Sequence, residues 1–213
     1  MEIQGKVIRI SSLITIVSLA LAAIIVFYLY FNRDPVRQIP PGKNVVSPAD
    51  GKIIGIVDLS KIKKKEIKIK KGLMGEIKTI ASDIPNAKYL ISIFMSVFDM
   101  HVQRAPVGGN VISTAHKKGK FLIANKLKAL IENEKNEVVI ENKDIGKIKV
   151  IQAAGAFARR VVCFAKKSEI LLKGQRIGRI KLGSQVVLII PGLKLKVKKG
   201  MHVSAGETII AEY

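Results

Sequence analysis

Several residue types are scarce in this chain of 213 residues, and each scarcity excludes a class of protein. The single cysteine, Cys163, excludes an internal disulfide framework and a cysteine-based zinc cluster. Because Cys163 lies in the apolar run Val161–Ala165, we expect a small buried hydrophobic side chain. The lack of disulfides favours, slightly, a cytoplasmic location for the folded part. Only 7 prolines and a hydrophobic share of 48% exclude a disordered chain.

Acidic residues are also few: 16 Asp and Glu stand against 37 Lys and Arg, which gives a formal net charge of +21. Codon bias or a hot habitat can produce such a composition. As a functional signal, the excess predicts a polyanionic partner, either nucleic acid or an anionic bilayer surface. The interleaved aromatic residues of an RNA-binding sheet are missing. We therefore expect an anionic membrane as the partner and no nucleic acid.

A long uncharged run near the N-terminus supports the membrane. Residues 13–31 (LITIVSLALAAIIVFYLYF) are long enough to span a bilayer as a helix, at about 1.5 Å per residue. A cleaved signal peptide is the alternative, but its apolar core would be shorter. Aromatic residues cluster at the C-terminal end of the run, as in an interfacial belt. We predict a retained anchor over residues 1–32 in the cell membrane; the flanking Lys and Arg residues give a small preference for a cytoplasmic C-terminal side.

The rest of the chain is predicted to be one mainly β domain. Residues 33–43 contain three prolines and a glycine, and are typical of a linker. From residue 44 to 213 short β-type runs alternate with turn residues, which predicts a mainly β (α+β) fold: an antiparallel sandwich or a partly open barrel. The expected strands are 45–46, 52–57, 66–70, 89–94, 110–113, 137–140, 148–151, 160–164, 176–180, 185–190 and 193–197, with a helix at 121–131.

Few residues suggest chemistry by themselves. The histidines, His101, His116 and His202, have no spacing that favours a metal site, so we expect none. Asp50 lies in the turn-like segment 47–52 (SPADGK), and Gly183-Ser184 reads as a hairpin turn between two strands.

Their order and context nevertheless resemble the phosphatidylserine decarboxylase family, in particular its short form, which includes archaetidylserine decarboxylases. The resemblance covers nearly all of the chain from residue 31. It rests on seven blocks in the family's order: 31–37 (FNRDPVR), 46–52 (VSPADGK), 94–106 (FMSVFDMHVQRAP), 116–121 (HKKGKF), 132–136 (ENEKN), 151–160 (IQAAGAFARR) and 173–184 (KGQRIGRIKLGS).

The resemblance implies a proenzyme that cuts itself between Gly183 and Ser184 into a beta chain (1–183) and an alpha chain (184–213), which remain together as a heterodimer. Ser184 would become a covalent pyruvoyl group, the cofactor. That group would form a Schiff base with the serine amine of a phospholipid substrate and accept the electrons released with CO₂. Glycine before the serine suits such a cut, because it lets the carbonyl be approached closely.

The resemblance also implies an Asp–His pair that activates Ser184, which by matching position is Asp50 and His101. Longer members carry a second histidine where this chain has Arg104, and arginine cannot accept a proton. His101 would then serve both reactions, or His116 would share the work. Asp99 could orient His101 or could cap a turn.

A non-enzymatic alternative comes from residues 193–211, which resemble a biotinyl/lipoyl-type hammerhead and would fit a membrane adaptor. The long coiled-coil heptads of such adaptors are absent. A membrane serine hydrolase is a third class, but residues 182–186 (LGSQV) lack its Gly-x-Ser-x-Gly motif.

Overall fold

A computed structural model describes residues 2–61, 80–118, 134–154, 161–180 and 184–213, with the backbone alone for residues 2–10. The strand predicted at 66–70, the helix predicted at 121–131 and Gly183 of the predicted cleavage site lie outside the described residues. The chain divides into two units, residues 1–34 and 35–213.

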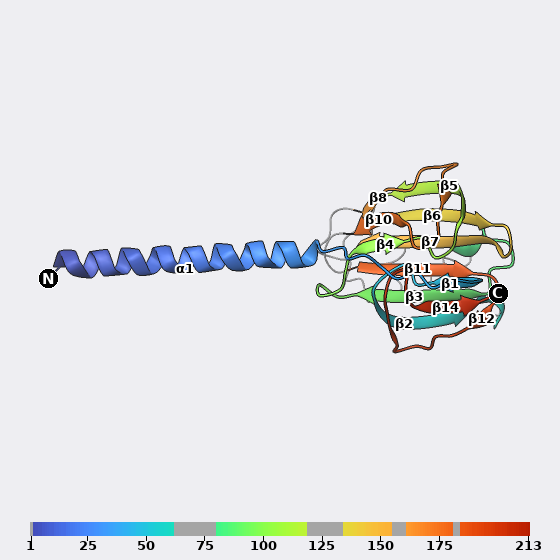
Figure 1. The fold of residues 1–213 in the computed structure, drawn as a ribbon, viewed down its shortest axis with the longest axis horizontal. Coiled ribbons are helices and arrows are strands. Elements are labelled where there is room, and N and C mark those ends of the chain that lie inside the picture. Colours follow the sequence, from blue (N-terminus) through green and yellow to red (C-terminus); the bar gives the residue numbers. More distant parts are fainter. Residues whose placement is uncertain (1, 62–79, 119–133, 155–160, 181–183) are drawn as a thin grey trace, which may run out of the picture. The chain divides into compact units, whose positions relative to one another are not determined.

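The first unit is the helix α1 (Glu2–Phe31) (Figure 1). Its segment Ser11–Phe31 has a mean hydropathy of 2.6 and is long and apolar enough to cross a membrane. The side chains from 11 to 30 are exposed, and the hydroxyl of Thr15 donates to the Ser11 carbonyl at 3.0 Å. Such a bond within the helix satisfies a hydroxyl that lipid could not. The predicted helix is therefore present.

The second unit is built from three sheets in which every strand pairing among the described residues is antiparallel. The large sheet curls into a half-barrel (Figure 1). Its order is β13 (His202–Val203), β2 (Gly51–Asp58), β3 (Tyr89–Met95), β11 (Ser184–Ile190), β7 (Gly146–Ala154), β6 (Lys135–Asn142), β5 (Gly109–Lys117) and β9 (Ile170–Leu171).

Two three-stranded sheets complete the unit. One has the order β1 (Asn44–Val46), β14 (Ile209–Glu212), β12 (Lys194–Leu195); the other has β4 (Val102–Arg104), β10 (Arg176–Ile180), β8 (Val161–Cys163). A short 3-10 turn, η1 (Leu59–Lys61), follows β2. The C-terminal residues that resemble a hammerhead are thus divided between two sheets, because β13 pairs with β2 while β12 and β14 pair with each other.

The strand β11 lies in the interior of the large sheet, between β3 and β7, and all seven of its residues are buried. Side chains alternate along a strand, so Val186 and Leu188 face one apolar cluster while Val187 and Ile189 face another. The first cluster includes residues of all three sheets; the second includes Ile80 from the segment before β3. Because both faces are covered, β11 reads as a continuous apolar run rather than an alternating one.

The predicted fold class, mainly β and antiparallel with an N-terminal apolar helix, is confirmed. Each described predicted strand has a counterpart in the structure, whereas β4, β9, β13 and β14 were not predicted. These strands have two to four residues, too few for a period-2 pattern to emerge.

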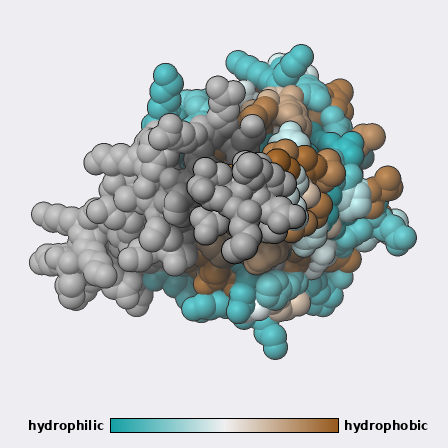
Figure 2. Space-filling view, turned by 90° about the vertical axis from the view of Figure 1, so that its left-hand side faces the viewer, coloured by the Kyte–Doolittle hydropathy of each residue, from teal (hydrophilic) through white to brown (hydrophobic). Residues whose placement is uncertain are grey.

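Residues 35–43 contain neither helix nor strand and belong to the second unit. The Ile39 side chain lies so close to Gly174 and Gly206 that a side chain at either glycine would collide with it. Among the coloured residues of the face in Figure 2, hydrophilic ones line the top and bottom margins, and hydrophobic ones also reach the surface on the right.

Candidate active site

Ser184 begins the central strand and is fully buried. It pairs in register with Met95 of β3 on one side and Ala154 of β7 on the other. Its side chain faces the first apolar cluster, as Val186 does two residues on. The hydroxyl contacts the Met95 Sδ at 3.3 Å, and a thioether is a weak hydrogen-bond acceptor. The serine is therefore desolvated and held by a bond that is easily broken.

His101 lies just before β4 and is 1% exposed. Its Nδ1 lies 2.8 Å from the Asp99 carbonyl oxygen. A carbonyl can only accept, so Nδ1 carries the proton and Nε2 is the basic nitrogen of the neutral ring. The His101 carbonyl accepts from the Ile180 amide at 3.1 Å, which ties the histidine to the end of β10, four residues before Ser184 in the chain.

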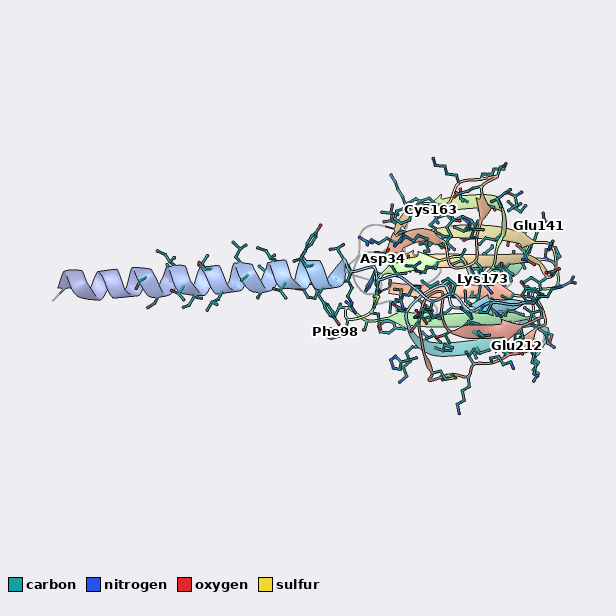
Figure 3. All side chains as sticks on the ribbon, viewed as in Figure 1. Asp34, Phe98, Glu141, Cys163, Lys173 and Glu212 are labelled. Atoms are coloured by element: carbon teal, nitrogen blue, oxygen red, sulfur yellow. The ribbon has the colours of Figure 1, made fainter. Side chains whose placement is uncertain are left out.

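In the loop before His101, the side chain of Asp99 caps a turn. The Asp99 carboxylate accepts hydrogen bonds from the Ser96 amide and hydroxyl, both at 2.7 Å. Its main-chain carbonyl, not its side chain, orients His101. The same loop exposes Phe98, whose side chain is 67% accessible and lies at the tip, clear of the strands (Figure 3).

Gln103 joins the His101 segment to Ser184. Its Nε2 donates to the His101 carbonyl at 3.0 Å and contacts the Met95 Sδ at 3.5 Å, the same sulfur that Ser184 contacts. Gln103 is fully buried. The segments around residues 101 and 184, predicted to act together, thus meet around one sulfur atom and one amide.

Asp50 precedes a turn at Gly51 and is held by two partners. Gly51 after it has φ 138°, and a side chain there would collide with the Phe94 carbonyl, so the turn requires glycine. Asp50 Oδ2 accepts from Arg37 Nη2 at 2.6 Å and Oδ1 accepts from the Ala205 amide at 2.7 Å. Burial raises the pKa of Asp50 above its usual value, although the Ala205 amide and Arg37 act in the opposite direction.

Arg37 links this carboxylate to the segment of His101. Its Nη1 donates to Glu207 Oε2 at 3.0 Å, and its Nη2 contacts Met100 Sδ at 2.8 Å, one residue before the histidine. Burial tends to lower the pKa of Arg37, but Asp50 and Glu207 outweigh it and the pKa is raised, so the guanidinium stays charged. The motif at 31–37 contains Arg37, but its sequence pattern does not indicate this role.

The structure places His116 and His202 on strands that are not neighbours of β11. His116 is on β5, its side chain 45% accessible and its Nε2 3.4 Å from Glu134 Oε1. The strands β6 and β7 separate β5 from β11, a distance of about 14 Å at 4.8 Å per strand. Arg104 donates to the carbonyls of Gly174 and Pro35 at 3.1 and 3.2 Å, and so holds two loops. His202 lies exposed on the edge strand β13.

Cys163 corrects one expectation, because it is partly rather than fully buried. It lies on β8, and its thiol donates to the Ala165 carbonyl at 3.3 Å (Figure 3). Burial raises the pKa of this thiol, although a bond with the Asn136 side chain acts the other way. The thiol is therefore protonated at neutral pH and a poor nucleophile.

Comparison with known proteins gives one family. The family model for phosphatidylserine decarboxylase matches residues 24–211. A phosphatidylserine decarboxylase proenzyme of Chlorobium phaeobacteroides is 38% identical over 97% of this chain and 88% of that protein. A proenzyme of Methanothermobacter thermautotrophicus, named for archaetidylserine decarboxylation, is 38% identical over 92% of this chain and 85% of its own length. A phosphatidylserine decarboxylase proenzyme of Cereibacter sphaeroides is 39% identical over 88% of this chain and 75% of its own.

Proposed function

The chain belongs to the phosphatidylserine decarboxylase family, and on this basis we propose that it is a self-cleaving, pyruvoyl-dependent decarboxylase of phospholipid serine. It would convert phosphatidylserine or archaetidylserine to the corresponding ethanolamine lipid. The observation that carries the proposal is Ser184: a fully buried serine at the start of the central strand, beside the segment that bears a buried histidine.

Self-cleavage needs a nucleophile, a base and a source of water. The Ser184 hydroxyl oxygen adds to the Gly183 carbonyl carbon, and its proton passes to the basic nitrogen of His101. The C–N bond then breaks, the nitrogen takes that proton, and an ester joins Gly183 to the Ser184 oxygen. Loss of the Ser184 α-proton and cleavage of its Cβ–O bond release residues 1–183 with a carboxylate end. Water hydrolyses the remaining unsaturated residue, and ammonia leaves.

The surroundings of Ser184 fit the small pyruvoyl group that these reaction steps would leave at this position. Met95 and Ala154 flank the position on the neighbouring strands, and the Gln103 amide offers a donor to a carbonyl oxygen. A pyruvoyl ketone supplies an electron acceptor next to the carbon that loses CO₂. His101, which is buried in the neighbouring segment, can return a proton to the product carbon.

The sheet pairing supports a heterodimer of the two products. The alpha chain, residues 184–213, would begin with β11, which pairs over its full length with β3 and over six residues with β7. Both neighbours belong to the beta chain, and β13 and β14 also pair with beta-chain strands. Because β11 is buried on both faces, releasing it would expose the whole core.

The helix α1 and the surplus of positive charge support a site at an anionic membrane surface, with the catalytic unit on the cytoplasmic face. The exposed Phe98 of the His101 loop is the kind of side chain that inserts at head-group height.

An intact mass of the purified protein tests the proposal. We expect two fragments, 1–183 and 184–213, and the 30-residue fragment should resist Edman degradation because a ketone replaces its amine. Ser184→Ala should remain a single chain. A wild-type chain that stays intact, or a cut in the alanine variant, would contradict the mechanism; an intact wild type would favour the adaptor alternative.

A further inference from the structure

A chain of three buried amides runs from β6 to the neighbourhood of Ser184. Asn136 Nδ2 donates to Gln152 Oε1 at 2.9 Å, and Gln152 Nε2 donates to Gln103 Oε1 at 2.9 Å. Gln103 Nε2 donates to the His101 carbonyl at 3.0 Å. All three side chains are at most 2% exposed. Sequence reasoning gave none of them a role.

The hydrogen bonds of the three amides run in one fixed direction. The His101 carbonyl can only accept, so the end of Gln103 that faces it must be the NH₂ group. The Gln103 oxygen then faces Gln152 and accepts a hydrogen bond from the Gln152 NH₂ group. The Gln152 oxygen in turn accepts one from the Asn136 NH₂ group. Each amide thus prevents the next from flipping, and the last NH₂ group is locked in place beside Met95.

That last NH₂ group has one strong acceptor and one weak one. One contact of Nε2 is to the His101 carbonyl and the other is to the Met95 sulfur at 3.5 Å. The Ser184 hydroxyl, at 3.3 Å, is directed at the same sulfur. Two donors therefore share one poor acceptor, and one of them is the hydroxyl whose attack would create a strong acceptor.

We propose that the Gln103 amide is the donor that stabilises the oxyanion of self-cleavage, a role that rests on the proposed function. When the Ser184 oxygen adds to the preceding carbonyl carbon, the negative oxygen on that carbon lies about 2.4 Å from the Ser184 oxygen by ordinary bond lengths. The N–H that meets only the sulfur at rest gains a charge-assisted bond to this oxygen, which is absent before the attack. Gln103 then acts on the transition state and not on the resting chain.

The chain offers a matched control. Gln185 is 1% exposed and adjacent to Ser184, but its side chain faces the opposite side of the sheet. Gln103→Met and Gln185→Met each replace a buried amide with an apolar side chain of similar length that cannot donate. The full-length variants are pulse-labelled in cell-free translation with detergent, and the cleaved fraction is followed on a denaturing gel, so that no decarboxylation is measured.

We expect Gln103→Met to cleave about 10²-fold more slowly than the wild type, the usual loss for one oxyanion donor. Gln185→Met should stay within about threefold of the wild type. Equal rates for wild type and Gln103→Met, or equal slowing in both variants, would overturn the inference. A wild type that never cleaves would instead overturn the proposed function, so the two failures are distinguishable.

If Gln103→Met loses its cooperative thermal transition and is therefore unfolded, Gln103→Glu tests the donor role instead. A carboxylate cannot donate, but a protonated acid can, and burial raises the pKa of a carboxyl group from about 4.3. The rate of this variant relative to the wild type should therefore rise at least tenfold between pH 8 and pH 5, because protonation of the shared base cancels in the ratio. A ratio that does not change with pH would overturn the inference.

Discussion

Removing the buried ammonium group of Lys149 should destabilise the second unit strongly. Lys149 lies on β7, and its side chain is 2% exposed. Its Nζ contacts Asp83 Oδ1 at 2.5 Å, the Ile80 carbonyl at 2.7 Å and Glu137 Oε2 at 3.1 Å. Since Ile80 also packs in the second apolar cluster, Lys149 fastens the segment before β3 to the sheet.

Lys149→Met keeps the length of the side chain and deletes its charge. Breaking a buried ion pair costs about 3–5 kcal/mol. Glu137 would keep Lys135 as a partner at 3.1 Å, so we expect the lower end of that range, about 3 kcal/mol. For a domain of this size the melting temperature should fall by roughly 6–12 °C.

The Lys149–Glu137 ion pair makes the loss of stability in Lys149→Met depend on pH. Burial acts to raise the pKa of Glu137, but Lys149 and Lys135 outweigh it and lower the pKa below 4.5. A lowered folded pKa stabilises the fold above the unfolded pKa, and this stabilisation is lost as the pH falls through the folded value. The gap in melting temperature between wild type and Lys149→Met should therefore narrow on acidification from pH 7 to pH 4.

Circular dichroism melts in detergent at both pH values measure the gap. Lys147→Met is the control, because Lys147 is on the same strand but only partly buried; it should change stability by about 1 kcal/mol or less. Equal melting temperatures for wild type and Lys149→Met at pH 7, the same loss in both variants, or a gap that widens in acid would refute the reasoning.

Two further predictions concern the base and the membrane. His101→Ala should slow maturation by about 10²–10⁴-fold on a gel time course, whereas His116→Ala, three strands from Ser184, should mature normally; the reverse pattern would make His116 the base. A chain that begins at Pro35, which keeps Arg37 and its ion pair with Asp50, should be extractable without detergent. It should bind anionic vesicles at low salt and dissociate as salt rises, because screening shortens the reach of surface charge to about 10 Å at 0.1 M; binding that persists at 1 M salt would show that charge is not the cause.

Local sequence determined much of this protein. The uncharged run ending at Phe31 specifies a helix long enough to span a membrane, whatever it packs against. Runs such as 89–94 and 185–190 specify strands, because β-branched and aliphatic residues between turn residues suit a pleated sheet. The family blocks single out Ser184 and His101 as candidates without any structure. These signals depend on residues close together in the chain, so they can be read along it.

The tertiary structure alone decided which side chains meet. The register of β11 against β3 sets Ser184 beside Met95, and a slip of one residue would turn it to the opposite face. The Gln103–Gln152 bond joins residues 49 positions apart, and Arg37 reaches both Asp50 and Glu207. Strand order, likewise, puts His116 three strands away from Ser184. Such contacts depend on sheet pairing between distant segments, and no local pattern encodes that pairing.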